Sequence, residues 1–326
     1  MQDATTLTGA TEADLDAFRR PLTGFCYRML GSPFEAEDAV QETLLRAWRS
    51  LSGFDGRSSL STWLHRIATN VCVDMLKSRQ RRAMPMDFGP AQEPVETNLH
   101  TRPEITWVEP IPGTALEGET DPADVAVSNE SIKLAFIAAL QHLPPRQRAA
   151  LILCEVLRWR AAEVAELLET SVASVNSALQ RARATLDASG LTAESAQPQV
   201  DPAQTELLQR YVDAFQRYDL EALTAVISAD AKQSMPPYDM WLSGRDDIFA
   251  WWWGPGIGCK GSRLLPAPKA NGSVAYGQYK PSPSSGYDPW ALQVIEVEDG
   301  SITQLTFFLD TKRFFPLFGL PDRLES

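Results

Sequence analysis

The chain has 326 residues, of which 44% are hydrophobic and 22% are charged, an ordinary composition for two or three globular domains. Its longest apolar runs fall far short of the roughly 20 residues that a membrane-spanning helix needs, and its acidic N-terminus lacks the apolar core of a signal peptide. We therefore expect a cytoplasmic protein. The four cysteines and three histidines are scattered along the chain, so we expect reduced, buried thiols, no metal and no cofactor.

The net charge of −12 argues at first against a nucleic-acid partner, but this charge is distributed unevenly along the chain. Residues 15–82 carry a net charge of +4, whereas residues 83–127 carry −8. Residues 128–190 are close to neutral, and the remainder of the chain is acidic again. This pattern indicates a modular chain whose first segment remains compatible with binding nucleic acid.

Residues 14–30 and 34–51 have apolar side chains at helical spacing, which predicts two amphipathic helices. Pro21 either kinks the first helix or marks a later start. In the second helix, the spacing places Trp48 on the core-facing stripe. The opposite face carries Asp38, Gln41, Glu42 and Leu45. An exposed leucine among acidic side chains favours a partner that is basic and partly apolar, although a solvated helix face shows the same pattern.

A third helix is predicted over residues 60–82, after a loop rich in glycine and serine. Its apolar residues include Trp63 and Leu64, which we place in the core. Its outer face carries, at steps of three and four residues, Arg66, Asn70, Asp74, Lys77 and Arg81. The amide of Asn70 can form paired hydrogen bonds with base edges. Cations near a helix C-terminus also stabilise the helix dipole without any DNA contact.

Two segments, EAEDAVQETLLRAW (35–48) and FDGRSSLSTWLHRIATNVCVDMLKSRQRR (54–82), resemble region 2 of bacterial sigma factors of the extracytoplasmic-function group. In that family the acidic helix docks on the clamp helices of the polymerase β′ subunit, and the next helix with its loop melts the −10 promoter element. The resemblance implies contacts with core RNA polymerase by Asp38, Gln41, Glu42 and Leu45. It implies contacts with the −10 element by Phe54, Arg57, Ser58, Arg66, Asn70, Lys77 and Arg81.

Residues 86–127 are rich in proline, glutamate and glycine and lack periodicity, so we interpret them as an acidic linker. Within the linker, ITWVEPIPG (105–113) is too apolar for a pure spacer, and we expect it to dock on a folded part of the protein. The resemblance to sigma factors implies that the linker threads toward the polymerase active-site cleft and the RNA exit path.

Four further helices are predicted over residues 124–142, 146–157, 161–168 and 173–188. The last two form a helix-turn-helix, whose second helix enters the DNA major groove in such units. This segment resembles sigma region 4, which reads the −35 element and contacts the polymerase β flap. The implied DNA contacts are Ser171, Ser174, Asn176, Ser177, Gln180, Arg181 and Arg183. Glu169 falls in the turn, where a left-handed backbone would cost about 1 kcal/mol.

After a second linker at residues 189–202, two helices are predicted over residues 203–218 and 220–227. Three alternating segments, VAYGQYK, WALQVIEVEDG and ITQLTFFLD, predict antiparallel strands with a hairpin turn at residues 298–300. Together with WLSGRDDIFAWW (241–252), this order of elements resembles the SnoaL-like α+β cone, a cystatin-type fold.

Many members of that superfamily hold a small molecule in the cone, and some are isomerases or cyclases. The residues that we test as a ligand pocket here are Asp213, Trp241 and Asp310, with Asp239 as a further acid. The aromatic side chains either line such a pocket or fill the core, and we favour the core. No histidine follows His142, which removes the easiest general base, so we expect no catalysis.

We predict a multidomain chain of two all-α sigma domains, a helical bundle and a helix-turn-helix, followed by an α+β SnoaL-like domain. The predicted boundaries are 10–85 for region 2, 86–127 for the linker, 128–190 for region 4 and 203–326 for the SnoaL-like domain. The predicted function is promoter-specific transcription initiation with core RNA polymerase, modulated by the C-terminal domain. Two alternatives remain: a free-standing helix-turn-helix DNA-binding regulator, and a fusion whose C-terminal domain is a catalytic isomerase or cyclase.

Overall fold

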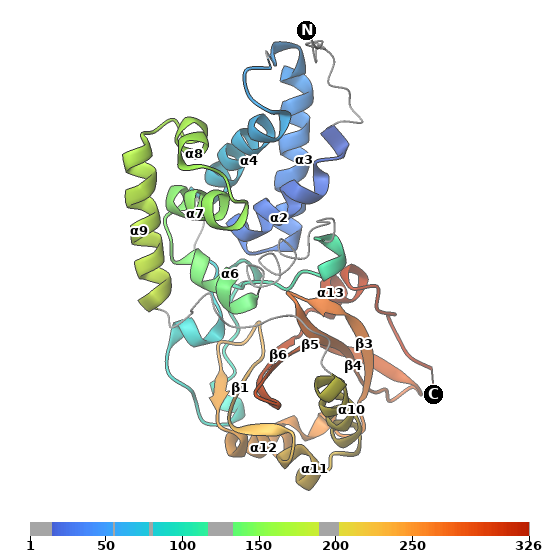
Figure 1. The fold of residues 1–326 in the computed structure, drawn as a ribbon. Helices are drawn as coiled ribbons and strands as arrows, with labels where there is room; N and C mark the ends of the chain where they lie inside the picture. Colours follow the sequence, from blue (N-terminus) through green and yellow to red (C-terminus); the bar gives the residue numbers. More distant parts are fainter. Residues whose placement is uncertain (1–14, 55, 78–80, 117–132, 189–201, 326) are drawn as a thin grey trace. The chain divides into compact units, whose positions relative to one another are not determined.

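The computed structural model describes residues 15–54, 56–77, 81–116, 133–188 and 202–325 (Figure 1). The chain divides into two compact units. The first unit contains Met1–Arg82, Val108–Ile111 and Ala115–Ala196. The second unit contains Ala83–Trp107, Pro112–Thr114 and Gln197–Ser326. Within the described part of the predicted linker, residues 86–107 and 112–114 therefore belong to the second unit, and residues 108–111, 115 and 116 belong to the first.

The first half of unit 1 is a bundle of three helices, α2 (Arg19–Leu30), α3 (Pro33–Ser50) and α4 (Leu60–Leu76). Helix α2 starts later than the periodicity suggested, so that Pro21 lies in its first turn. It ends at Gly31, whose left-handed φ of 73° lets its N–H bond to the carbonyl of Tyr27 at 2.7 Å. The next helix starts at once, because the hydroxyl of Ser32 accepts a hydrogen bond from the N–H of Glu35.

Two predictions about this bundle are wrong. Helix α4 ends at Leu76, before the basic residues Arg81 and Arg82. Trp48, which we placed in the core, is 59% exposed. The physical reason is the register of α3, because Trp48 follows Gln41 and Leu45 at steps of seven and three residues and so shares their outward face.

The second half of unit 1 consists of α6 (Leu134–Gln141), α7 (Pro145–Leu151), a π-helical turn η6 (Ile152–Val156), α8 (Ala161–Leu167) and α9 (Val172–Ala188). Helices α8 and α9 confirm the predicted helix-turn-helix. Glu169 adopts the left-handed conformation expected for the turn, with φ of 52°. The predicted start of the first of these helices, before residue 133, lies outside the described residues, as does the second linker at residues 189–201.

Arg148 of α7 joins the two halves of unit 1. Its guanidinium is buried and donates hydrogen bonds to the carbonyl of Met29 at the end of α2 and to the side chain of Gln141, the latter at 2.6 Å. It also donates to the carbonyls of Gln141 and Leu143, both at 3.1 Å. Burial lowers the pKa of Arg148 to about 10, so the side chain stays charged at neutral pH.

The second unit is built on a six-stranded sheet in the order β2-β1-β6-β5-β4-β3. Its strands are β1 (Ile227–Ser234), β2 (Trp241–Ser243), β3 (Arg263–Ala270), β4 (Ser273–Pro281), β5 (Tyr287–Glu298) and β6 (Ser301–Phe308). All neighbouring pairs are antiparallel except β1 and β6. The β5–β6 turn confirms the predicted hairpin, because Asp299 and Gly300 both have positive φ, as a type I′ turn requires.

Helices cover both faces of this sheet (Figure 1). Successive strand residues point to opposite faces, and Phe307 packs with the core of α10 (Pro202–Arg217), α11 (Leu220–Thr224) and α12 (Arg245–Trp253). Phe308 points to the other face, where it contacts Phe314 of α13 (Thr311–Leu317) at a ring distance of 5.6 Å. No helix in the described part of the chain is long and apolar enough to cross a membrane.

Candidate protein and nucleic-acid interfaces

The predicted protein-binding face of α3 is accessible. Asp38, Gln41 and Leu45 are exposed, with 40% of the Leu45 surface open to solvent. Glu42 differs from them, because its carboxylate accepts a hydrogen bond from the Nε of Arg46 at 2.6 Å and is half-buried. The side chain of Gln41 donates to Glu37 at 3.1 Å. Asp38 has no ion-pair partner among the described residues, so it is the acid of this face most open to an external cation.

The loop before α4 has a defined aromatic feature. The ring of Phe54 packs against that of Trp63 with 5.0 Å between centroids, and both side chains are half-buried. Arg57 is exposed and Ser58 is half-buried. Ser59 ends the loop by accepting a hydrogen bond from the N–H of Thr62 at 3.0 Å, which caps α4. Trp63 is therefore less buried than predicted and forms part of the loop surface.

The polar row on α4 is only partly open. Asn70 is exposed at mid-helix. Arg66 pairs with Glu166 of α8 at 3.5 Å and donates to its carbonyl at 3.4 Å. Arg81 approaches the Nδ1 atom of His142 at 2.6 Å. Lys77 pairs with Asp74 at 2.8 Å, and this hydrogen bond lowers the pKa of Asp74. Two of the predicted DNA contacts are thus engaged by the region 4 half of unit 1.

Helix α9 presents a polar face of Asn176, Ser177, Gln180 and Arg181, all exposed. Ser171 caps the N-terminus of α9, a role that was not predicted from the sequence. Its hydroxyl accepts a hydrogen bond from the N–H of Ser174 at 3.1 Å and contacts the Ser174 hydroxyl at 2.9 Å, as an N-cap does. Arg183 is exposed but paired with Glu155. The four side chains of that polar face have no ion pair or side-chain hydrogen bond with another described residue, so they form the accessible part of the predicted −35 surface.

The residues tested as a ligand pocket in unit 2 do not meet. Asp213 is exposed on α10, and Asp310 lies at the start of α13, 3.9 Å from Arg313. The indole N–H of Trp241 donates to the carbonyl of Gly89 at 2.9 Å. None of these three side chains belongs to the buried cluster of the cone.

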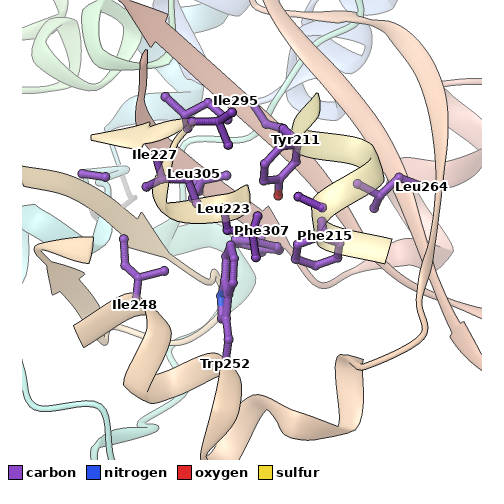
Figure 2. Close-up of a cluster of buried hydrophobic side chains, with 14 of the residues drawn as sticks. Tyr211, Phe215, Leu223, Ile227, Ile248, Trp252, Leu264, Ile295, Leu305 and Phe307 are labelled. Carbon is purple, nitrogen blue, oxygen red and sulfur yellow. The ribbon is translucent and has the colours of Figure 1, made fainter. Parts of the chain in front are cut away.

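The buried cluster of the cone consists of aromatic and aliphatic side chains, among them Tyr211, Phe215 and Trp252 (Figure 2). A chain of buried hydrogen bonds begins at Tyr211 of this cluster. Tyr211 donates to Gln293 at 2.9 Å, Gln293 donates to Gln278 at 3.0 Å, and Gln278 donates to Ser262 at 3.1 Å. All four side chains are buried, and burial raises the pKa of Tyr211. Both glutamine amides in this hydrogen-bonded series have partners, so the series can be buried without an unsatisfied amide. This agrees with a packed core, which the sequence analysis favoured over a ligand pocket.

A surface that the sequence did not reveal lies at the β2 edge of the sheet, where linker residues bind. We call Pro237, Asp239 and Trp241 the linker-binding edge. The N–H of Arg102 donates to the carbonyl of Pro237, and the N–H of Asp239 donates to the carbonyl of His100, each at 3.0 Å. The N–H of Gln92 donates to the carbonyl of Trp241 at 3.0 Å.

Side-chain contacts also hold these linker residues against the rest of unit 2. The Nε of Arg102 lies 2.9 Å from the Oδ2 of Asp239, which is the one buried carboxylate in the described part of unit 2. The guanidinium of Arg102 also lies 4.0 Å from the ring centre of Phe88, a cation–π contact. Glu104 pairs with Arg313, and Leu99 packs against the core of the cone. The predicted docking of residues 105–113 is also confirmed, since Trp107, Val108, Glu109 and Ile111 are buried.

Three family models match successive parts of the chain. Residues 15–82 match the model of Sigma-70 region 2, residues 133–186 match Sigma-70, region 4, and residues 208–305 match the SnoaL-like domain. The solved structure of the extracytoplasmic function sigma factor SigJ of Mycobacterium tuberculosis has a similar fold, with a TM-score of 0.62 at 23% identity. That match covers 96% of this chain and 100% of SigJ.

Two relatives are similar to this chain in sequence over much of its length. The ECF RNA polymerase sigma factor SigG of Mycobacterium tuberculosis is 42% identical over 319 residues, which cover 97% of this chain and 85% of SigG. SigJ of the same organism is 30% identical over 225 residues, covering 67% of this chain and 62% of SigJ. Similarity of this extent includes both sigma regions and the C-terminal domain. The chain therefore belongs to the extracytoplasmic-function group of the sigma-70 family, as an RNA polymerase sigma factor that initiates transcription and is not an enzyme.

Proposed function

We propose that this sigma factor docks on the β′ clamp helices of core RNA polymerase through the exposed face of α3. The observation that carries the proposal is the accessibility of Asp38, Gln41 and Leu45 on one side of that helix. An exposed acid without an ion-pair partner among the described residues, beside apolar area, fits a partner that offers basic and apolar side chains. In the same proposal, region 4 contacts the β flap.

The −10 element is assigned to α4 and its preceding loop. Asn70 supplies an exposed amide that can pair with a base edge. Phe54 and Trp63 supply half-exposed rings on which an extruded base can stack, and Arg57 supplies an exposed cation for the phosphates. Arg66 and Arg81 join this surface only after they leave Glu166 and His142, so we propose that the two halves of unit 1 separate on promoter binding.

The −35 element is assigned to α9. Asn176, Ser177 and Gln180 can reach base edges in the major groove, whereas Arg181 can contact a phosphate. This surface has few cations, because Arg183 is paired with Glu155. We therefore expect region 4 to bind duplex DNA weakly unless polymerase is present.

The C-terminal domain is proposed to modulate initiation by holding the linker. Residues 83–107 cannot lie against the linker-binding edge and also extend through a polymerase channel, since one segment cannot occupy two places. Holding the linker therefore competes with assembly on polymerase. Release costs the contacts of Arg102 with Asp239 and of Glu104 with Arg313.

Reconstituted transcription with core polymerase on a promoter library tests the whole proposal. The full chain should give start sites at a defined −10 and −35 pair, and Asp38→Arg should remove them while the protein stays folded. Removal of all residues after Gly190 should raise or lower the yield at the same start sites. If the full chain binds promoter DNA tightly without polymerase and Asp38→Arg changes nothing, the docking assignment is refuted.

A further inference from the structure

Two of the three histidines of the chain lie where the region 2 half of unit 1 meets the region 4 half. His65 belongs to α4, and its ring contacts that of Trp159 in the loop before α8, with 5.1 Å between centroids. His142 follows α6, and its Nδ1 lies 2.6 Å from the guanidinium of Arg81. The third, His100, is exposed and belongs to unit 2. Histidine changes its charge between about pH 5 and 8, so the contact between the halves can respond to pH.

The surroundings of His65 favour its neutral form. Its Nδ1 lies 2.9 Å from the backbone carbonyl of Ser61, which can only accept a hydrogen bond, so Nδ1 carries the proton. Its Nε2 is buried and has no hydrogen-bond partner among the described residues. A second proton, on Nε2, would place a charge between the rings of Phe25 and Trp159 without an acceptor for it. Burial accordingly lowers the pKa of His65.

The contact made by His142 also needs an unprotonated nitrogen. A guanidinium has only donors, so the hydrogen bond from Arg81 uses the lone pair of the His142 Nδ1. A proton on Nδ1 would remove this acceptor and set two cations against each other. Arg148 adds a further positive charge nearby, because it donates to the carbonyl oxygens of the residues on either side of His142.

The carboxylates on the elements around the two histidines are already paired with cations. Asp74 of α4 pairs with Lys77, and Glu155 of η6 pairs with Arg183. On α8, Glu163 pairs with Arg160 and Glu166 pairs with Arg66. The other titratable side chains in α2, α4, α7, η6 and the loop before α8 are arginines, cysteines and one tyrosine, among them Cys26, Arg28, Arg146, Arg148, Cys154 and Arg158. No carboxylate in the described residues of these elements is therefore left over to stabilise a protonated histidine.

We propose that this contact is a proton-operated latch, in which proton uptake by His65 and His142 releases the region 4 half of unit 1 from the region 2 half. For His65 the sign is set by its lowered pKa. The released form binds the proton more readily, so the closed form is favoured above the ordinary histidine pKa of about 6.5 and is lost as the pH falls below it. Release frees Arg66 and Arg81 from region 4. On the proposed function of these two arginines, acidification then favours binding of the −10 element.

The distance between spin labels on two exposed residues, Arg49 of α3 and Ala184 of α9, tests the latch in the full chain from pH 8 to 5. Labels attached through unnatural residues leave the four cysteines intact. The ratio of released to closed molecules should rise about tenfold per pH unit for each proton taken up. His65→Gln and His142→Gln should each lower this slope by about one proton, and the double variant should stay closed. His100→Gln is the matched control and should leave the slope unchanged.

A distance that does not change with pH in the unmodified chain overturns the proposal, as does a slope that neither variant alters. Tighter closure at low pH also overturns it, because protonated His65 would then bind the ring of Trp159 as a cation. A melting curve identifies a His65→Gln variant that does not fold. The side chain of His142 is exposed, so in that case His142→Gln decides the outcome.

Reconstituted transcription at both ends of the pH range separates the latch from the proposed function. If the labels move apart on acidification and the proposed separation on promoter binding is wrong, the start-site yield of the double variant equals that of the unmodified chain. The latch then stands and the proposed separation fails. If the labels do not move while Asp38→Arg still removes the start sites, the latch fails and the proposed docking stands.

Discussion

Arg102 and Asp239 lie 137 residues apart in the chain and meet with 2.9 Å between the guanidinium Nε and the carboxylate Oδ2. The carboxylate is largely buried, and its Oδ1 has no hydrogen-bond partner within the described residues. Arg102 is therefore the group that compensates the charge of Asp239 in unit 2. This pairing places a residue of the predicted linker in the structure of the SnoaL-like domain.

Reversing the charge of Arg102 should detach the linker. Arg102→Asp would set two carboxylates against each other in a poorly solvated site, whereas the double variant Arg102→Asp, Asp239→Arg restores the pair. Hydrogen exchange of the N–H groups of Gln92 and Arg102, which donate to unit 2 carbonyls, measures the attachment directly. We expect faster exchange in the single variant and recovery in the double variant. Equal exchange in all three proteins would show that the ion pair does not hold the linker.

Features that depend on local spacing could be predicted from the sequence, whereas contacts between distant parts of the chain could not. The exposed acidic face of α3, the turn at Glu169 and the β5–β6 hairpin depend on residues close together in the chain, and local spacing predicted them. The contacts of Arg148 with Met29 and of Arg102 with Asp239 depend on the tertiary fold. Trp48 was misplaced because the periodicity of α3 allows two faces, and its apolar character favoured the wrong one.

Strands β1 to β3 were not predicted individually, and β3 shows the reason. Pro266 and Pro268 interrupt its pattern, which is tolerated because β3 is an edge strand of the sheet. The candidate pocket residues lie outside the buried cluster for a different reason. An acid beside an apolar run, such as Asp213, can lie on the outer face of an amphipathic helix or point into the domain core. The tertiary fold determines which, and Asp213 is exposed.

Arg148→Met should destabilise unit 1 markedly. The substitution keeps an apolar stem but leaves the carbonyls of Met29 and Leu143 and the side chain of Gln141 without their donor. A buried acceptor without a partner costs about 1–3 kcal/mol, so the loss should exceed that of a single ordinary hydrogen bond. Chemical denaturation measures the free energy of unfolding. Arg146→Met on the exposed side of α7 is the control and should change the free energy of unfolding little. Equal effects of the two substitutions would show that Arg148 does not hold the two halves of unit 1 together.

The stability of unit 1 should fall as the pH drops below the ordinary histidine pKa of about 6.5. Burial lowers the pKa of His65, whose Nδ1 faces the carbonyl of Ser61 and whose ring lies between Phe25 and Trp159. Because the unfolded chain then binds the proton more readily, His65 contributes stability above pH 6.5 that is lost on acidification. The melting temperatures of the unmodified chain and of His65→Gln between pH 5 and 8 test this. Parallel curves would show that His65 does not cause the pH dependence.

Arg181→Ala should weaken binding of the polymerase complex to −35 DNA and reduce its dependence on salt. A protein that loses one phosphate contact should lose about one unit of the slope of log affinity against log salt concentration. Arg183→Ala should have a smaller effect, because Arg183 is paired with Glu155, whereas Arg181 is exposed and has no ion-pair partner among the described residues. Fluorescence anisotropy over a salt series measures both slopes. If Arg183→Ala proves the more damaging of the two, the pair with Glu155 opens on DNA and Arg183 is the phosphate contact.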